Sequence, residues 1–262
     1  FLVNQKKFPD PSKKEVATDG AVAGKEEVQM SAAEIKQRIY ALFAVFGVVI
    51  FFWMSFHQNG YSLTYFARDY VDLSVIKIDL GFTQIKGAEI FQSVNPMIVV
   101  FLTPLVMYVF GRLRAKGKEP SAPRKIAIGM GIAALAYVFL MVCSLGLPEQ
   151  STLGSMSEAA KHDMLLTPWV MVGMYFILTM AELFISPLGL SFVSKVAPPH
   201  LQGVMQGAWL AATALGNSLL FIGGVLYTSV PLWACWLVFV GACAASMITM
   251  LAMVKWLERV AK

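Results

Sequence analysis

The side chains of this sequence that could do chemistry lie inside long apolar segments. Glu182 is the one carboxylate between Thr167 and Ser194, and Ser186 follows it by one helical turn. An ionisable group in mid-membrane costs about 2.5–3.5 kcal/mol on insertion scales, so it normally faces a cavity or a polar partner. Pro187 removes a helix hydrogen bond beside this carboxylate and predicts a kink. This face therefore predicts a binding cavity, and the alternative is a carboxylate in a closed hydrogen-bond network.

Two other apolar segments carry polar side chains in their interior. Gln92 and Asn95 are three residues apart on one helical face, and Pro96 after them predicts a second kink. His57 follows Trp53 by one turn, and an unperturbed imidazole takes and releases a proton near neutral pH. His57 therefore fits a proton carrier or a neutral hydrogen-bond bridge. Asn95 fits a binding residue or an interhelical contact.

A fifth apolar segment carries Gln206, Trp209 and Thr213 at helical spacing, which fits ordinary packing or the aromatic wall of a pocket. The motifs of serine hydrolases, zinc proteases and phosphate-binding loops do not occur in the sequence. The cysteines lie inside apolar runs with no paired spacing, which indicates packing rather than disulfides. We therefore expect no catalytic residues, no metal site and no enzyme.

The composition places these residues in a membrane protein. Of the 262 residues, 57% are hydrophobic and 14% are charged, and the mean hydropathy is +0.65. Soluble domains carry about 25% charged residues. The net charge of +5 comes from basic residues between the apolar runs, which is typical of membrane topology rather than of nucleic-acid binding.

The apolar runs predict an all-α membrane protein with six transmembrane helices. A span needs roughly 20 mostly apolar residues. The stretch from Val196 to Val254 has no charged residue and is too long for one span, so it must be two helices joined near Pro231. The predicted bundle is 34–262, with spans at about 39–67, 88–111, 126–148, 167–195, 201–227 and 231–256.

The basic residues predict the orientation of these spans. If both ends are cytoplasmic, the cytoplasmic segments hold 17 of the 21 Lys and Arg, which is a strong positive-inside pattern. Residues 1–33 are rich in Lys, Glu, Asp, Gly and Pro and predict a cytoplasmic linker or arm. Because the chain opens at Phe1, we expect it to be a piece of a longer protein.

Several of these segments resemble the proton-dependent oligopeptide transporter family of the major facilitator superfamily. The matching strings are Phe52-Trp-Met-Ser-Phe-His-Gln58, Phe91-Gln-Ser-Val-Asn-Pro96 and Glu182-Leu-Phe-Ile-Ser-Pro-Leu-Gly-Leu190, with Gly207-Ala-Trp209 further on. The resemblance covers about 39–262 and implies helices 7 to 12 of a twelve-helix transporter. One six-helix bundle of a major-facilitator fold is therefore expected, and the other six helices are missing.

The resemblance implies a role for each matched residue. Glu182 would hold the α-amino group of a di- or tripeptide with help from Asn95, and Ser186 would line the same pocket. Trp209 and Trp53 would form part of its aromatic wall, and we expect Gln92 to bind the substrate as well.

One residue departs from the family pattern. Many members carry an acidic residue where this chain has His57, so we hypothesise that His57 takes over proton coupling, with Glu182 as a second candidate. The implied function is proton-coupled peptide symport by alternating access in a bacterial inner membrane, driven by the proton gradient without a cofactor. The partners are the peptide, the lipid bilayer and the missing half, with no nucleic acid. The alternatives are a transporter for another small solute and a non-transporting scaffold or receptor subunit.

Overall fold

The computed structural model describes residues 30–76, 78–79, 84–85 and 87–261. The predicted arm at 1–33 lies almost entirely outside this part of the chain. The first helix begins at Ala32. The description below concerns the unit Ala32–Lys262.

Six helical segments of the described chain are long and apolar enough to cross a membrane, which confirms the predicted number of spans. They are Ala32–Tyr70, Ala88–Ala115, Ala122–Cys143, Trp169–Val196, Pro199–Ser229 and Leu232–Val260. The first begins seven residues before the predicted span and the third ends five residues before its predicted end. At the starts of the first and third spans, polar and basic residues that bounded the predictions continue the helix, whereas the third helix ends at Cys143, before Gly146 and Pro148.

The elements follow one another in a simple order along the chain. The helices are α1 (Ala32–Phe56), α2 (Ser62–Tyr70), α3 (Val94–Ala115), α4 (Ala122–Cys143), α5 (Glu158–Asp163), α6 (Trp169–Val196), α7 (Gln202–Ser218), α8 (Phe221–Ser229) and α9 (Leu232–Val260). Short 3-10 helices are η2 (His57–Gly60), η3 (Ala88–Ser93), η4 (Gln150–Ser155) and η5 (Pro199–Leu201), and the strands are β1 (Ile78–Asp79) and β2 (Gln84–Ile85).

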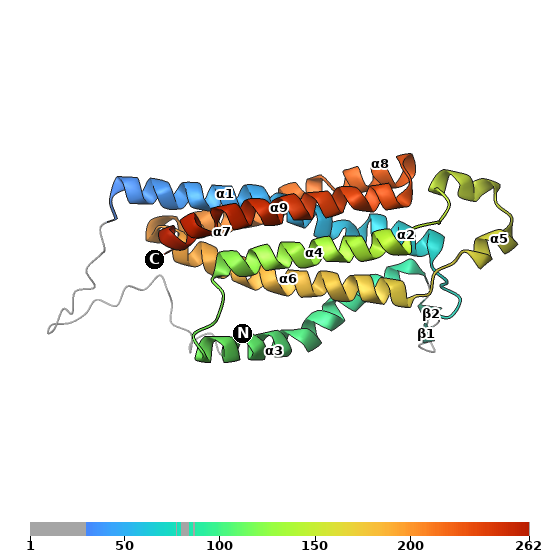
Figure 1. Ribbon diagram of the computed structural model, residues 1–262, viewed down its shortest axis with the longest axis horizontal. Coiled ribbons are helices and arrows are strands. Elements are labelled where there is room, and N and C mark those ends of the chain that lie inside the picture. The colour runs from blue at the N-terminus through green and yellow to red at the C-terminus, as the bar shows by residue number, and fades with distance from the viewer. Residues whose placement is uncertain (1–29, 77, 80–83, 86, 262) are drawn as a thin grey trace, which may run out of the picture. The chain divides into compact units, whose positions relative to one another are not determined.

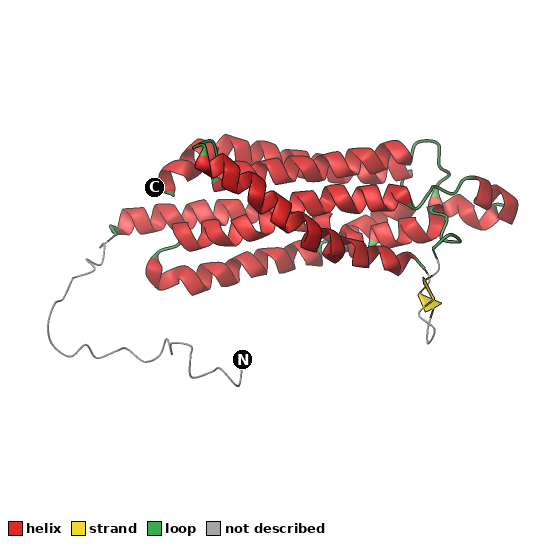
Figure 2. Cartoon of the chain, turned by 90° about the horizontal axis from the view of Figure 1, so that it is seen from below, coloured by secondary structure: helices red, strands yellow, loops and turns green. Residues whose placement is uncertain are grey.

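The packing is centred on α4, which lies between α9 and α6 (Figure 1). Figure 2 shows the same helices from below, with the short strands at one end of the bundle. The helix α1 packs along α7 and α9, whereas α3 packs mainly on α6. None of the described residues of α3 is fully buried within this chain. The core therefore consists of five spans, and α3 presents a large apolar surface.

Two of the spans are interrupted. The first span passes from α1 through η2 to α2, and the fifth passes from α7 to α8 through Leu219 and Leu220. Backbone carbonyls freed inside a membrane must find other donors. At the first interruption the hydroxyl of Tyr175 donates to the carbonyl of Asn59 at 2.6 Å, and the hydroxyl of Tyr137 donates to that of Ser55. Side chains of α6 and α4 therefore stabilise the interruption.

The two prolines predicted to kink a helix lie inside α6 and in the first turn of α3. The helix α6 runs from Trp169 to Val196 without interruption through Pro187. Pro96 lies in the first turn of α3, where its missing N–H removes no bond within the helix. The proline inside α3 is Pro104, which the sequence analysis did not single out.

The two ends of the bundle differ in their loops. At one end α3 passes into α4 through a turn in which Gly117 has a φ of 64°, a conformation that favours glycine. The Arg114 guanidinium and the Lys125 ammonium beside it lower the pKa of Glu119 in this turn to about 2. The first and last helices of the bundle also begin and end here (Figure 1).

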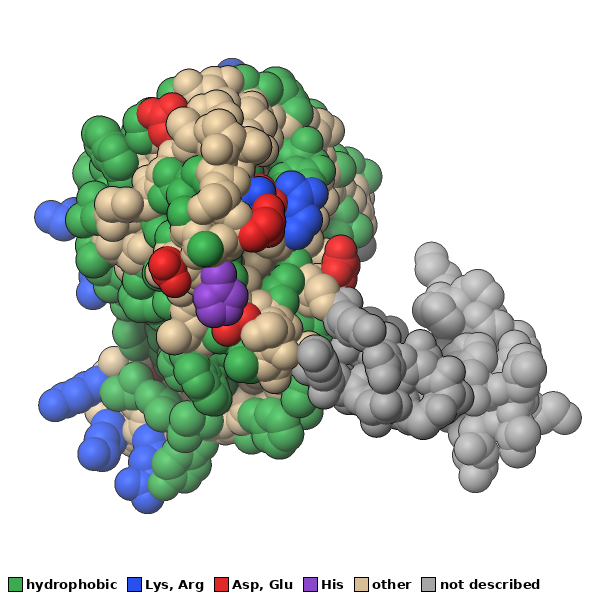
Figure 3. All heavy atoms as spheres, turned by 90° about the vertical axis from the view of Figure 1, so that its right-hand side faces the viewer, with side chains coloured by type: hydrophobic (Ala, Val, Ile, Leu, Met, Phe, Trp, Pro, Cys, Tyr) green, Lys and Arg blue, Asp and Glu red, His purple; other side chains and the backbone are tan. Residues whose placement is uncertain are grey.

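The opposite end carries α5, η4 and the antiparallel pair of β1 and β2, which the sequence analysis did not predict. A short parallel bridge between Val71 and Leu166 joins the loops after α2 and before α6. Figure 3 views this end, where acidic side chains lie among polar and hydrophobic ones. Arg68 and Lys161 are the basic residues that the structure describes here, and eleven others lie at or near the end with the α3–α4 turn.

Candidate functional site

Glu182 lies midway along α6 and is joined to α3 by one amide. Asn95 Nδ2 donates to Glu182 Oε2 at 3.0 Å and to Thr179 Oγ1 at 2.9 Å. Thr179 Oγ1 in turn donates to the Tyr175 carbonyl at 2.7 Å. The amide of Asn95 is therefore held by two residues of α6, and it orients the carboxylate of Glu182.

These residues form a stripe along α6. Tyr175, Thr179, Glu182 and Ser186 are spaced four, three and four residues apart, which places them on one face of the helix. Tyr175 and Thr179 are buried, and Glu182 and Ser186 are partly exposed. The sequence analysis missed Thr179, although its spacing from Glu182 was the available signal. Polar groups thus extend over three turns of a membrane span.

His57 and Trp53 form a second polar group at the end of α1. Their rings stack with centroids 5.0 Å apart and an interplanar angle of 18°. Within the described part of the chain, His57 Nδ1 and Trp53 Nε1 are buried and have no hydrogen-bond partner. Buried polar atoms normally have partners. The stacked rings therefore leave the indole N–H of Trp53 and one ring nitrogen of His57 unpaired within the described residues.

Trp209 lies in a tightly packed place between helices. Its side chain is 2% exposed. The indole covers Gly189 so closely that a Cβ atom there would lie 2.1 Å from Trp209 Cη2. Phe46 meets the same ring edge to face at 6.2 Å. In this conformation Trp209 joins α7 to α6 and α1, and its ring surface is not open.

Gln92 is directed toward a different helix from Asn95. Its Nε2 donates to Thr64 Oγ1 of α2 at 3.3 Å. Of the predicted binding residues, the structure brings Glu182 and Asn95 into contact and places Ser186 on the same face. Trp53 lies with His57, and Trp209 and Gln92 make the separate contacts described above.

The arrangement is suited to binding rather than to covalent chemistry. A carboxylate oriented by an amide can accept hydrogen bonds from an ammonium group. In the described ranges, no group of three or more His, Cys, Asp or Glu side chains is placed to hold a metal ion. Six spans with a half-buried carboxylate in the middle of one of them define the class as a bundle of a membrane transporter.

A sequence model described as the POT family matches residues 5–248. The chain belongs to this family, whose named relatives are peptide transporters rather than enzymes. Peptide transporter YePEPT of Yersinia enterocolitica is 29% identical over 182 residues, which are 70% of this chain and 32% of that protein. Dipeptide and tripeptide permease B of Salmonella typhimurium is 28% identical over 198 residues, which are 75% of this chain and 36% of that protein.

Solved structures show the same fold. A crystal structure of a mutant of peptide transporter POT superposes with a TM-score of 0.72 at 24% identity, over 90% of this chain and 43% of that chain. A POT family transporter in complex with a thioalcohol conjugated peptide superposes with a TM-score of 0.62 at 20% identity, over 90% and 44%. The chain thus spans about a third of the length of the curated relatives and less than half of the solved chains.

Proposed function

We propose that this chain is the C-terminal half of a proton-coupled symporter of di- and tripeptides. Family membership supports this proposal, and the relatives named above are peptide transporters and permeases. The observation that carries it is the contact between Asn95 and Glu182 in the interior of the membrane. The activity belongs to the intact transporter, because alternating access requires two bundles around one site.

Glu182 is the proposed partner of the peptide's α-ammonium group. Every di- and tripeptide with a free amino terminus carries this cation, whereas a sugar does not. The second hydrogen bond of Asn95, to Thr179, fixes the amide so that the carboxylate presents its remaining lone pairs. Ser186 adds a hydroxyl one turn along the same face, where it lines the pocket.

His57 is the proposed carrier of the coupling proton. Its Nδ1 has no hydrogen-bond partner among the described residues, so it is available to bind a proton. Glu182 is the second titratable group of the pathway. The proton gradient drives transport, and no cofactor takes part.

The proposed location is the inner membrane of a bacterium, with both ends of the chain in the cytoplasm. The basic residues support this orientation, since the turn between α3 and α4 and the ends of α1, α6 and α9 carry most of those the structure describes. The other partners are the lipid bilayer and the N-terminal six-helix half.

The test compares two ligands that differ only in the proposed recognition group. Intact transporter is titrated with a dipeptide and with its N-acetylated form, and thermal stabilisation is measured. We expect the dipeptide to stabilise the parent protein, the acetylated form to do so much less, and Glu182→Gln to remove the difference. Equal stabilisation by the two ligands in the parent would favour a transporter of another solute. No stabilisation by any small solute would favour a scaffold or receptor subunit.

A further inference from the structure

The interruptions of the first and fifth spans lie against each other. The first is η2, between α1 and α2, and the second is the turn at Leu219 and Leu220, between α7 and α8. Just before the second, α7 approaches α1 closely at Gly216, where a Cβ atom would lie 2.7 Å from the Ile50 carbonyl oxygen. Each of these spans is therefore divided into an inner and an outer segment at the same level.

One buried side chain joins the two interruptions. Gln58 is 0% exposed. Its Nε2 donates to the Leu220 carbonyl at 3.2 Å and to the Met54 carbonyl at 3.4 Å, and its Oε1 accepts from Ser62 Oγ at 2.8 Å. The amide thus contacts the last turn of α1, the first turn of α2 and the turn between α7 and α8.

Gly223 of α8 lies directly against the amide of Gln58. A Cβ atom at Gly223 would lie 2.1 Å from Gln58 Oε1 and 2.5 Å from its Cδ. Gln58 could move aside only by giving up hydrogen bonds to both spans. The absence of a side chain at Gly223 of α8 therefore leaves the room that the Gln58 side chain of η2 occupies.

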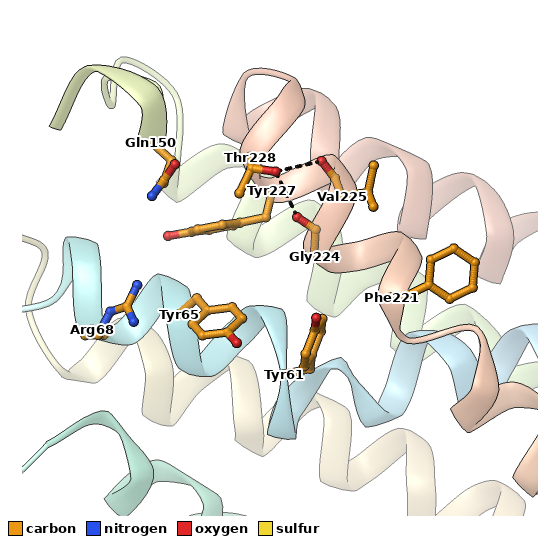
Figure 4. Close-up of a pocket in the computed structure, with 9 residues that line it drawn as sticks. All are labelled: Tyr61, Tyr65, Arg68, Gln150, Phe221, Gly224, Val225, Tyr227 and Thr228. Atoms are coloured by element: carbon orange, nitrogen blue, oxygen red, sulfur yellow. Dashed lines mark hydrogen bonds between the residues drawn. The ribbon is translucent and has the colours of Figure 1, made fainter. Parts of the chain in front are cut away.

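A second contact joins the outer segments at their far ends. The Tyr227 hydroxyl of α8 donates to Asp69 Oδ2 of α2 at 3.0 Å, and Asp69 also pairs with Arg68 at 2.7 Å. Between the two contacts lies a cavity of about 380 Å³, into which the rings of Tyr61 and Tyr65 project (Figure 4). Beside this cavity Tyr61 packs against Gly224 and the Tyr65 ring lies 6.3 Å from that of Tyr227, so α2 and α8 are in contact along their length.

We propose that Gln58 couples the two interruptions, so that α2 and α8 move as one unit when the outer ends of the spans move. Independent movement of either segment would break hydrogen bonds of a fully buried amide in a medium where no water replaces them. Joint movement keeps the hydrogen bonds of Gln58 to Ser62 and to the Leu220 carbonyl. Gln58 is a positioning residue that does not touch the peptide, and its role in the transport cycle rests on the proposed function.

The first test is a double-mutant cycle in the intact transporter. Gly223→Ala is expected to lower the thermal unfolding midpoint by several degrees in the parent. It is expected to cause little further loss in Gln58→Ala, where the added methyl finds space. Gly207→Ala is the matched control, because it lies in the same span and a Cβ atom there meets none of the described residues within 4 Å. Additive losses from Gln58→Ala and Gly223→Ala would overturn the coupling.

The second test measures movement directly. Spin labels at positions 65 and 229 report the distance between α2 and α8. We expect a narrow distance distribution in the parent and in Gly207→Ala, and a broadened one in Gln58→Ala. An equally narrow distribution in Gln58→Ala would overturn the proposal. Neither test uses peptide, so their results bear on Gln58 alone. If the intact transporter does not respond to peptides, the proposed function is contradicted, and the two tests of Gln58 remain valid.

Discussion

Thr179 provides the sharpest test of how the carboxylate of Glu182 is positioned. Replacing it with valine keeps the shape of the side chain and removes the hydroxyl that accepts from Asn95 at 2.9 Å. The carbonyl of Tyr175, to which the same hydroxyl donates, belongs to the helix itself. The substitution therefore acts mainly on the orientation of the Asn95 amide, and Glu182 itself stays in place.

The hydrogen bonds of the structure indicate how much peptide affinity Thr179→Val should lose compared with Asn95→Ala. A hydrogen bond between neutral groups contributes about 1 kcal/mol, which corresponds to about a fivefold change in Kd. A hydrogen bond to a charged group contributes about 1.5–3 kcal/mol, or roughly 10- to 150-fold. These values are upper bounds, since both hydrogen bonds exist before the peptide binds. We expect Thr179→Val to weaken peptide binding by up to about fivefold and Asn95→Ala to weaken it more.

The assay is a calorimetric titration of the intact transporter with a dipeptide. The matched control is Thr103→Val in α3, which removes a hydroxyl that, among the described residues, donates to the Val99 carbonyl of its own helix at 2.6 Å. Its peptide Kd should equal that of the parent. The double variant of Asn95→Ala and Thr179→Val should bind like Asn95→Ala alone, because the hydroxyl acts through the amide. Equal effects of Thr179→Val and Thr103→Val, or a full extra loss in the double variant, would refute the reasoning.

Three further predictions follow from the packing and the charges. Gly189→Ala should cost about 1–3 kcal/mol more than Gly207→Ala in thermal unfolding, because its methyl overlaps the Trp209 ring; equal midpoints would contradict this. His57→Gln should abolish uptake driven by a pH gradient and leave peptide exchange, and unchanged pH-driven uptake would exclude His57 as the proton carrier. The pKa of Glu119 is lowered from 4.5 to about 2 in the folded state, so its contribution is present above about pH 4.5 and is lost as the pH falls toward 2. Because Arg114 is exposed but Lys125, the other partner of Glu119, is buried, Glu119→Gln should lower stability at pH 7 by at least about 1 kcal/mol and flatten the decline below pH 4.5. A decline parallel to that of the parent would count against this.

The number of spans could be predicted because it depends on local properties. Apolar length and the placement of charged residues are read directly from the chain, and the six spans were found in this way. Glu182 could also be singled out, since a carboxylate in an apolar run is rare enough to need a partner. The family resemblance implied that Asn95 assists Glu182 in holding the peptide, and the structure shows a direct hydrogen bond between the two side chains, which was not predicted.

The interruptions of the first and fifth spans were not predicted, although Asn59-Gly60 in η2 is a turn signal. What stabilises the first one could not be read from the local sequence, because the carbonyls of Ser55 and Asn59 accept from tyrosines of α4 and α6 far along the chain. The position of Trp209 likewise depends on Gly189 in another helix. Pro96 was predicted to kink a span. Because the α-helix begins at Val94, Pro96 lies in its first turn, where the missing N–H removes no helix hydrogen bond.

The central position of α4 has a consequence for biogenesis. Its partner α9 is the last span of the described chain to be synthesised, and it supplies Trp236, Phe239 and Cys243, which are all 0% exposed. The indole N–H of Trp236 reaches back to Ser144 Oγ at 3.0 Å, just after α4. A nascent chain that has inserted five of these spans therefore still exposes the face of α4 against which α9 packs. That face is covered only after α9 has been synthesised, so a chain that stops before Leu232 leaves it exposed.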